Sequence, residues 1–103
     1  MSRSDALILE PDDGPVRSAL VWLHGLGATA DDFADLGRQM QCPGWRVIAL
    51  QAEPQAVTIF GGEVVPSWFD ILPKSGGRVT SNLDDLEESA RRVRTEFERQ
   101  REA

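Results

Sequence analysis

The sequence predicts an α/β fold in which helices flank a mostly parallel sheet, built as one domain over residues 1–103. Three observations support this prediction. Two apolar runs, residues 18–23 and 46–50, are typical of strands that are covered on both faces. A segment with helical spacing separates these runs, and a long amphipathic helix follows later in the chain. A strand, a short helix and a second strand imply a crossover connection, which joins parallel neighbours in one sheet.

The first elements lie in the N-terminal half. Residues 6–9 (ALIL) form a short apolar run that the turn signal EPDDGP closes, and residues 18–23 (SALVWL) give the first buried strand. The next helix is expected to begin near Thr29, because Asp32 completes a capping-box-like pair three residues later. Helical spacing then continues to the sequence CPG, after which residues 46–50 (RVIAL) give the second buried strand.

The C-terminal half contains one clear helix. Before it, residues 57–59 are expected to be extended, and residues 64–77 (VVPSWFDILPKSGG) are expected to form an ordered loop of irregular shape. The helix carries an apolar stripe whose members step by three and four residues: Leu83, Leu86, Ala90, Val93 and Phe97. The final residues, 98–103, are expected to fray.

Composition narrows the classes of function. The formal net charge of −6 disfavours nucleic-acid binding, which needs a clustered positive surface. One histidine and one cysteine, Cys42, cannot build a Cys/His-rich zinc site or an internal disulfide. No apolar run has the length of a signal-peptide core or of a membrane span. We therefore expect a soluble cytoplasmic protein without a metal.

The stretch VWLHGLGATADDF, residues 21–33, carries the strongest functional signal. A buried strand ends in His24-Gly25, and Gly27 allows a tight turn before the helix begins. Backbone N–H groups in such a loop, close to a helix N-terminus, are suited to stabilise a developing oxyanion. The alternative is an ordinary strand-to-helix turn that contains two glycines.

Several motifs in order resemble the carboxylesterase and acyl-protein thioesterase family of α/β-hydrolases. These motifs are LILEP, VWLHGLGA with a following DDF, VTIFGG, PSWFDI and LDDLEESARRV. The resemblance implies that Leu26 supplies an oxyanion-hole N–H. It also implies that His24, Gly25 and Gly27 support this loop, with His24 structural and not a general base. Trp68 and Phe69 match an aromatic loop beside the active site, where they would line the acyl pocket; the alternative for both is core packing.

The family's catalytic triad has no counterpart in these residues. In this fold the catalytic residues follow one another along the chain in the order Ser, Asp, His, and the Ser lies in a G-x-S-x-G elbow. No G-x-S-x-G occurs in this sequence. Ser75 in PKSGG is the nearest approach, but Pro73 stands where the first glycine belongs. The chain is therefore expected to be an N-terminal fragment, a partial α/β-hydrolase sheet that lacks the central nucleophile strand and everything after it.

Three functional hypotheses follow from these observations. The first is the N-terminal part of a cofactor-free serine hydrolase for carboxylic esters or acyl thioesters, inactive by itself. The second is one half of a split hydrolase with a separate C-terminal half, and the third is a non-catalytic module that binds acyl groups or a protein. Without the nucleophile strand, one buried strand becomes an edge, so self-association or a partner segment is expected.

Overall fold

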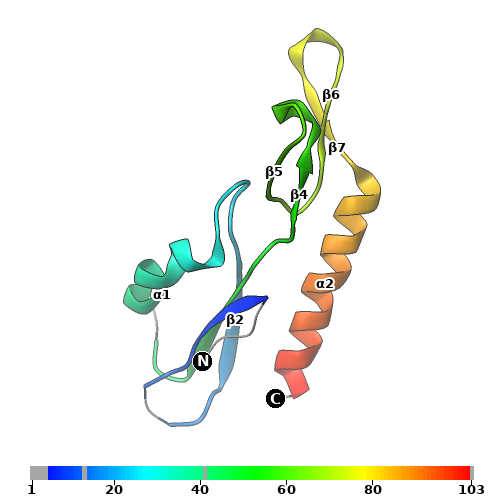
Figure 1. Ribbon diagram of the computed structural model, residues 1–103. Helices are drawn as coiled ribbons and strands as arrows, with labels where there is room; N and C mark the ends of the chain where they lie inside the picture. The colour runs from blue at the N-terminus through cyan, green and yellow to red at the C-terminus, as the bar shows by residue number, and fades with distance from the viewer. Residues whose placement is uncertain (1–4, 13, 41, 103) are drawn as a thin grey trace. The chain divides into compact units, whose positions relative to one another are not determined.

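The computed structural model describes residues 5–12, 14–40 and 42–102, which fold into two compact units, residues 1–51 and residues 52–103 (Figure 1). The first unit contains a three-stranded sheet with the order β1-β3-β2, formed by β1 (Ala6–Leu9), β2 (Ser18–Leu23) and β3 (Trp45–Leu50). Strands β2 and β3 are parallel, as the crossover connection predicts. Strand β1 pairs antiparallel with β3, so the α/β prediction is confirmed with a mixed sheet.

The helical segment between β2 and β3 begins where the capping pair predicts. It consists of a 3₁₀ helix η1 (Ala30–Phe33) that continues into α1 (Ala34–Met40). Thr29 N–H donates to the Asp32 carboxylate at 3.0 Å, and Asp32 N–H donates to the Thr29 carbonyl at 3.2 Å. These two bonds satisfy N–H groups at the start of the helix that would otherwise lack an acceptor.

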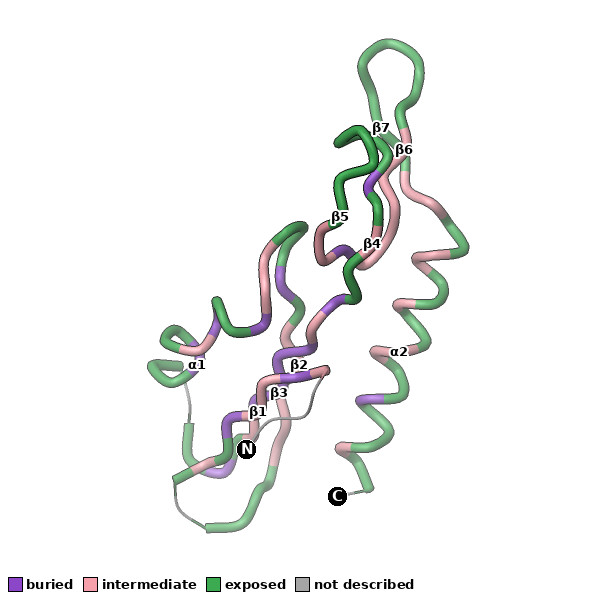
Figure 2. Tube along the Cα trace, viewed as in Figure 1, coloured by how far each residue is buried: buried purple, intermediate pink, exposed green. Residues whose placement is uncertain are grey.

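The core of the first unit forms between the sheet and η1. Its buried members are Leu9, Ala30, Phe33, Val47 and Ala49. The Phe33 ring stacks on Trp22 of β2, with the ring centroids 4.1 Å apart and the planes inclined by 19°. In Figure 2 the buried positions gather along β3, whose last four residues are all buried.

Strand β2 differs from the expectation of cover on both faces. Its first five residues are only half-buried, and Leu23 at its end is 42% exposed. The sheet order gives the reason: β2 lies at an edge and, within the described residues, pairs with β3 alone. Strand β2 is therefore more apolar than its partly exposed position in this structure requires.

The second unit is built from two antiparallel hairpins and a helix. Strand β4 (Pro54–Val57) pairs with β5 (Glu63–Pro66), and β6 (Ile71–Pro73) pairs with β7 (Val79–Ser81). The expectation of an extended segment at residues 57–59 is correct only for Val57, because η2 (Thr58–Phe60) turns the chain as a 3₁₀ helix. Gly61 and Gly62 follow with φ of 70° and 86°, which lets the chain return as β5.

Residues 64–77 are more regular than the sequence suggested. They include most of β5, all of β6 and the 3₁₀ helix η3 (Ser75–Gly77), where an irregular loop was expected. Proline is compatible with these strands because each strand is short and pairs on one side only within its hairpin. Pro54 and Pro66 are partners at the end of the β4–β5 ladder.

Helix α2 (Leu83–Glu102) confirms the C-terminal helix and extends it. The expectation of fraying over residues 98–103 is wrong up to Glu102, and Ala103 lies outside the described residues. In the apolar stripe, Leu83 is 72% exposed and Phe97 is 52% exposed, whereas Leu86 and Val93 are partly buried. In the described part of the chain, no helix has the length and apolar character needed to cross a membrane.

Gly37 gives a test of packing in the first unit. A Cβ atom at this buried position would lie 2.7 Å from Phe33 Cε2 and 2.8 Å from Leu9 Cδ1. The stacked Trp22 limits how far the Phe33 ring can move. We expect Gly37→Ala to lower the free energy of unfolding by about 1–2 kcal/mol, because overpacking outweighs the gain in helix propensity. Urea unfolding measures the change.

The exposed Gln39, two residues further along α1, provides the control. Gln39→Ala should leave the free energy of unfolding within about 0.5 kcal/mol of the parent chain. A Gly37→Ala variant that is more stable than the parent chain would contradict this account of the core.

Candidate active site

The loop between β2 and η1 contains a tight turn around Leu26. Ala28 N–H donates to the Gly25 carbonyl at 3.1 Å, which places Leu26 and Gly27 at the two central positions of a β-turn. Gly27 has φ of 76°, and no described residue other than glycine has a positive φ. A negative φ at Leu26 followed by a positive φ at Gly27 is the pattern of a type II turn. The second glycine of the motif is therefore required by the backbone itself.

The Leu26 N–H is available to an external acceptor. The closing bond of the turn uses Ala28 N–H, and within the described residues the Leu26 N–H donates to no protein atom. Leu26 is 42% exposed, so the turn lies at the surface of the first unit. A donor without an internal partner, in a turn that directly precedes a helix, is suited to bind an anionic oxygen.

His24 is buried beneath this loop, with only 3% of its surface exposed. Its Nδ1 lies 2.7 Å from the Gly25 carbonyl oxygen, and its Nε2 lies 3.2 Å from Nε2 of Gln51. Both ring nitrogens of His24 therefore contact protein groups of the first unit. Gln51, which follows β3, also accepts a hydrogen bond from Ala30 N–H at 2.8 Å.

The aromatic residues predicted for substrate binding lie in the second unit, in the loop between β5 and β6. Trp68 and Phe69 are both half-buried there. The buried Ser67 donates through its hydroxyl to the Phe69 carbonyl at 2.5 Å, and the Ser89 hydroxyl of α2 donates to the Trp68 carbonyl. The guanidinium of Arg92 lies 5.4 Å from the centroid of the Trp68 ring, within the range of a cation–π interaction.

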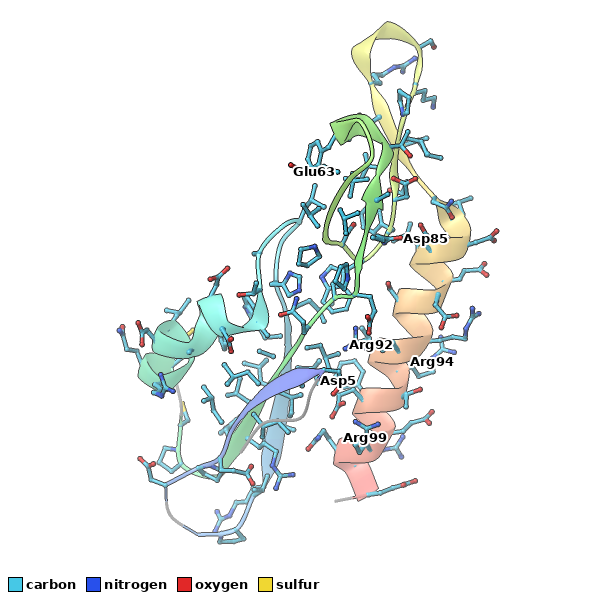
Figure 3. All side chains as sticks on the ribbon, in the orientation of Figure 1. Asp5, Glu63, Asp85, Arg92, Arg94 and Arg99 are labelled. Atoms are coloured by element: carbon cyan, nitrogen blue, oxygen red, sulfur yellow. The ribbon has the colours of Figure 1, made fainter. Side chains whose placement is uncertain are left out.

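A cavity of about 350 Å³ lies beside Trp68 in the second unit. Its lining is mostly polar or charged: Glu53, Gln55, Ser67, Trp68, Asp85, Glu88, Ser89 and Arg92. Figure 3 labels Asp85 and Arg92, which contribute to this lining from α2. Phe69 is not part of its lining.

Asp70 organises the second unit, although the sequence motifs did not single it out as a functional residue. Its carboxylate accepts hydrogen bonds from Thr58 N–H at 2.7 Å and from the Thr58 hydroxyl at 2.6 Å. Its own N–H donates to the Asp85 carboxylate at 2.8 Å, and its carbonyl accepts from Asn82 N–H at 2.9 Å. One residue thus joins the end of β4 to the first turn of α2. The sequence signal that could have identified Asp70 is its place in the motif PSWFD, directly after Trp68 and Phe69.

The remaining candidates do not form a nucleophilic site. Ser75 lies in the exposed turn η3, and neither a strand–elbow–helix arrangement nor a histidine partner accompanies it in the second unit. The hydroxyls of Ser67 and Ser89 donate to backbone carbonyls. Within residues 5–12, 14–40 and 42–102, no group of three or more His, Cys, Asp or Glu residues is placed to hold a metal ion.

The two Thr58 bonds give Asp70 a measurable pH dependence. They lower the pKa of the Asp70 carboxyl below its ordinary value, the side-chain hydroxyl having the largest effect. The ionised Asp70 carboxylate therefore stabilises the folded state fully above the ordinary Asp pKa of about 3.9. This stabilisation is lost as the pH falls through the lower pKa that Asp70 has in the folded state. We expect the Thr58 amide proton shift to titrate with a midpoint below that ordinary value, as measured by NMR.

Asp70→Asn should abolish this titration and speed hydrogen exchange at the Thr58 amide. Glu63→Gln removes an exposed carboxylate of β5 in the same unit and should leave the titration unchanged. A Thr58 amide whose shift titrates identically in the Asp70→Asn variant would show that another group is responsible.

Known proteins are similar in sequence to this chain. A family model described as phospholipase/carboxylesterase matches residues 4–95. Acyl-protein thioesterase 1 of Debaryomyces hansenii is 26% identical over 88 residues, covering 79% of this chain and 38% of that protein. A probable carboxylesterase SOBER1-like of Arabidopsis thaliana is 33% identical over 79 residues, covering 72% of this chain and 30% of that protein.

A solved structure gives the same result for the fold. The crystal structure of Zea mays acyl-protein thioesterase 2 matches with a TM-score of 0.75 and 27% identity, covering 90% of this chain and 38% of that one. The chain thus spans less than two-fifths of the length of each of these proteins, and the match to the solved structure lies in its N-terminal part. The chain belongs to the phospholipase/carboxylesterase family, and its two units are part of an α/β-hydrolase fold.

Proposed function

We propose that the chain is the N-terminal portion of a serine hydrolase that cleaves carboxylic esters or acyl thioesters through an acyl-serine intermediate. Residues 1–103 then belong to one incomplete α/β-hydrolase-like domain, which acts in the cytoplasm and needs no cofactor. The observation that carries the proposal is the turn at Leu26, whose N–H has no acceptor among the described residues. Membership of the phospholipase/carboxylesterase family supports a role for that N–H in binding the oxyanion formed during ester hydrolysis.

The chemistry assigned to this loop is electrostatic. Attack on an ester or thioester carbonyl creates a tetrahedral intermediate with a negatively charged oxygen, and the Leu26 N–H would donate to that oxygen. A donor of this kind contributes about 2.7–4 kcal/mol to the transition state in a well-studied protease. Because the donor is a backbone group, His24, Gly25 and Gly27 contribute by setting the path of the backbone around it.

The edge position of β2 supports the proposal that a further strand pairs with β2 in the complete hydrolase. In this fold a second oxyanion donor is the N–H that follows the nucleophile, so the nucleophile strand must end close to the Leu26 loop. The unpaired edge of β2 is the side of the strand where a further parallel strand would place its end beside that loop. The half-buried apolar residues of β2 and the exposed Leu23 are consistent with an additional strand there.

The donor role of Leu26 can be tested in a chimaera. Residues 1–97 are joined to the corresponding C-terminal part of a related acyl-protein thioesterase, and hydrolysis of a short p-nitrophenyl ester is followed. Leu26→Pro removes the backbone N–H and is compatible with the turn, because proline is favoured at the second position of a type II turn. We expect kcat to fall by about 10²–10³-fold.

Leu26→Ala retains the N–H and is the matched control, for which kcat should stay close to that of the parent chimaera. Equal kcat values for the Pro and Ala variants, in chimaeras with the same circular dichroism spectrum, would contradict the assignment of the oxyanion donor.

A split hydrolase is the second candidate, and the exposed apolar residues favour it. Leu83 and Phe97 on α2, together with the free edge of β2, leave apolar surface and strand hydrogen-bonding groups for a second polypeptide. The 103-residue chain alone should show no turnover of the ester, whereas mixing it with a separately expressed C-terminal half should restore hydrolysis. Turnover by the chain alone that disappears in Ser75→Ala would overturn the assignment of the nucleophile to the C-terminal half.

A further inference from the structure

A single side chain connects both ends of the Leu26 loop. Gln51 directly follows β3, and its amide bridges His24, the first residue of the loop, and Ala30, the first residue of η1. Ala30 N–H lies 2.8 Å from Gln51 Oε1, and Gln51 Nε2 lies 3.2 Å from His24 Nε2. His24 Nδ1 then lies 2.7 Å from the Gly25 carbonyl oxygen. The groups form one continuous chain of hydrogen bonds.

The direction of every bond in this chain follows from its first member. A backbone N–H can only donate, so the Gln51 atom that faces Ala30 must be the carbonyl oxygen Oε1. The Gln51 NH₂ group therefore faces His24 and donates to Nε2. Since Nε2 accepts, the neutral His24 ring carries its proton on Nδ1, and that N–H donates to the Gly25 carbonyl.

The end of this chain controls the peptide that contains the candidate donor. The Gly25 carbonyl accepts two hydrogen bonds, one from His24 Nδ1 at 2.7 Å and one from Ala28 N–H at 3.1 Å. The Gly25 C=O and the Leu26 N–H belong to the same planar trans peptide, so they point in opposite directions. Holding the carbonyl toward His24 and Ala28 therefore directs the Leu26 N–H away from these two groups.

We propose that Gln51 is a positioning residue that selects the Nδ1–H tautomer of His24 and thereby orients the Leu26 N–H. The proposal rests on the proposed function in so far as the Leu26 N–H is the oxyanion donor. It adds Gln51 and one tautomer of the His24 ring to that site. The burial of His24 strengthens the effect, because hydrogen bonds are less weakened by water at a buried site.

Nitrogen-15 NMR of the full chain tests the tautomer directly. His24 is the only histidine in the sequence, so its ring signals need no assignment by mutation. At about pH 8, where an ordinary histidine is neutral, we expect Nδ1 to be protonated and Nε2 to be unprotonated. A ring protonated on Nε2 in the parent chain would overturn the proposal.

Two variants of Gln51 test its role in setting this state. Gln51→Glu offers only acceptors to Ala30 and His24, so we expect the Nε2 signal to change to that of a protonated nitrogen. Gln51→Leu removes both bonds, so the single tautomer should be lost and the Ala28 and Ala30 amides should exchange faster by roughly tenfold. Gln39→Leu makes the same chemical change at an exposed position of α1 and should alter neither readout.

The outcomes separate this proposal from the proposed function. An unchanged His24 spectrum in the Gln51→Glu variant would overturn the positioning role, and this readout remains decisive if the Leu variant fails to fold. In the chimaera, Gln51→Leu should lower kcat with little change in KM, because the oriented donor acts in the transition state. If Leu26→Pro leaves kcat unchanged while the tautomer behaves as expected, the oxyanion assignment fails and the role of Gln51 in the loop stands.

Discussion

The parallel register of β2 and β3 is the constraint on which the candidate site depends. Leu23 and Leu50, the last residues of the two strands, are partners in the ladder. The chain therefore leaves both strands at the same edge of the sheet, and the next residues, His24 and Gln51, lie within hydrogen-bonding distance of each other. A shift of one residue would turn the side chains of one strand to the opposite face and separate these two groups. The register of β2 and β3 thus determines both the packing of the core and the contact between His24 and Gln51.

The second unit keeps its loops in place by a different means. Few large apolar side chains of this unit are fully buried, Val57 being the clearest case. The Asp70 carboxylate instead accepts from the Thr58 hydroxyl, and the Ser89 hydroxyl of α2 donates to the Trp68 carbonyl, while Ser67 bonds within the loop between β5 and β6. Such bonds are directional, so they hold the PSWFD backbone in one conformation even where apolar burial is modest. The lowered pKa of Asp70 is a direct consequence of this arrangement.

The sequence was informative wherever a structural feature depends on neighbouring residues. Apolar runs, the Thr29–Asp32 pair and the stripe of α2 are local patterns, and the structure contains the corresponding strands and helices. The β4–β5 and β6–β7 hairpins were missed because three of their four short strands contain proline, and their pairing is decided by tertiary contacts. Gln51 was missed for a related reason: it lies 27 residues from His24, and only the parallel register brings the two together.

The same reasoning explains at which positions of the loop between β2 and η1 the identity of the residue matters. The candidate donor is the N–H of Leu26, yet the leucine side chain is partly exposed and the donor would be present with almost any residue there. Gly27 is required by its positive φ, and His24 and Gln51 are required by the directions in which their hydrogen bonds run. The orientation of one peptide group is therefore encoded in residues on either side of it and in a residue from the next strand. A backbone functional group leaves its signature in the side chains that hold it, which is why the loop motif identified the family while Gln51 became visible only in the structure.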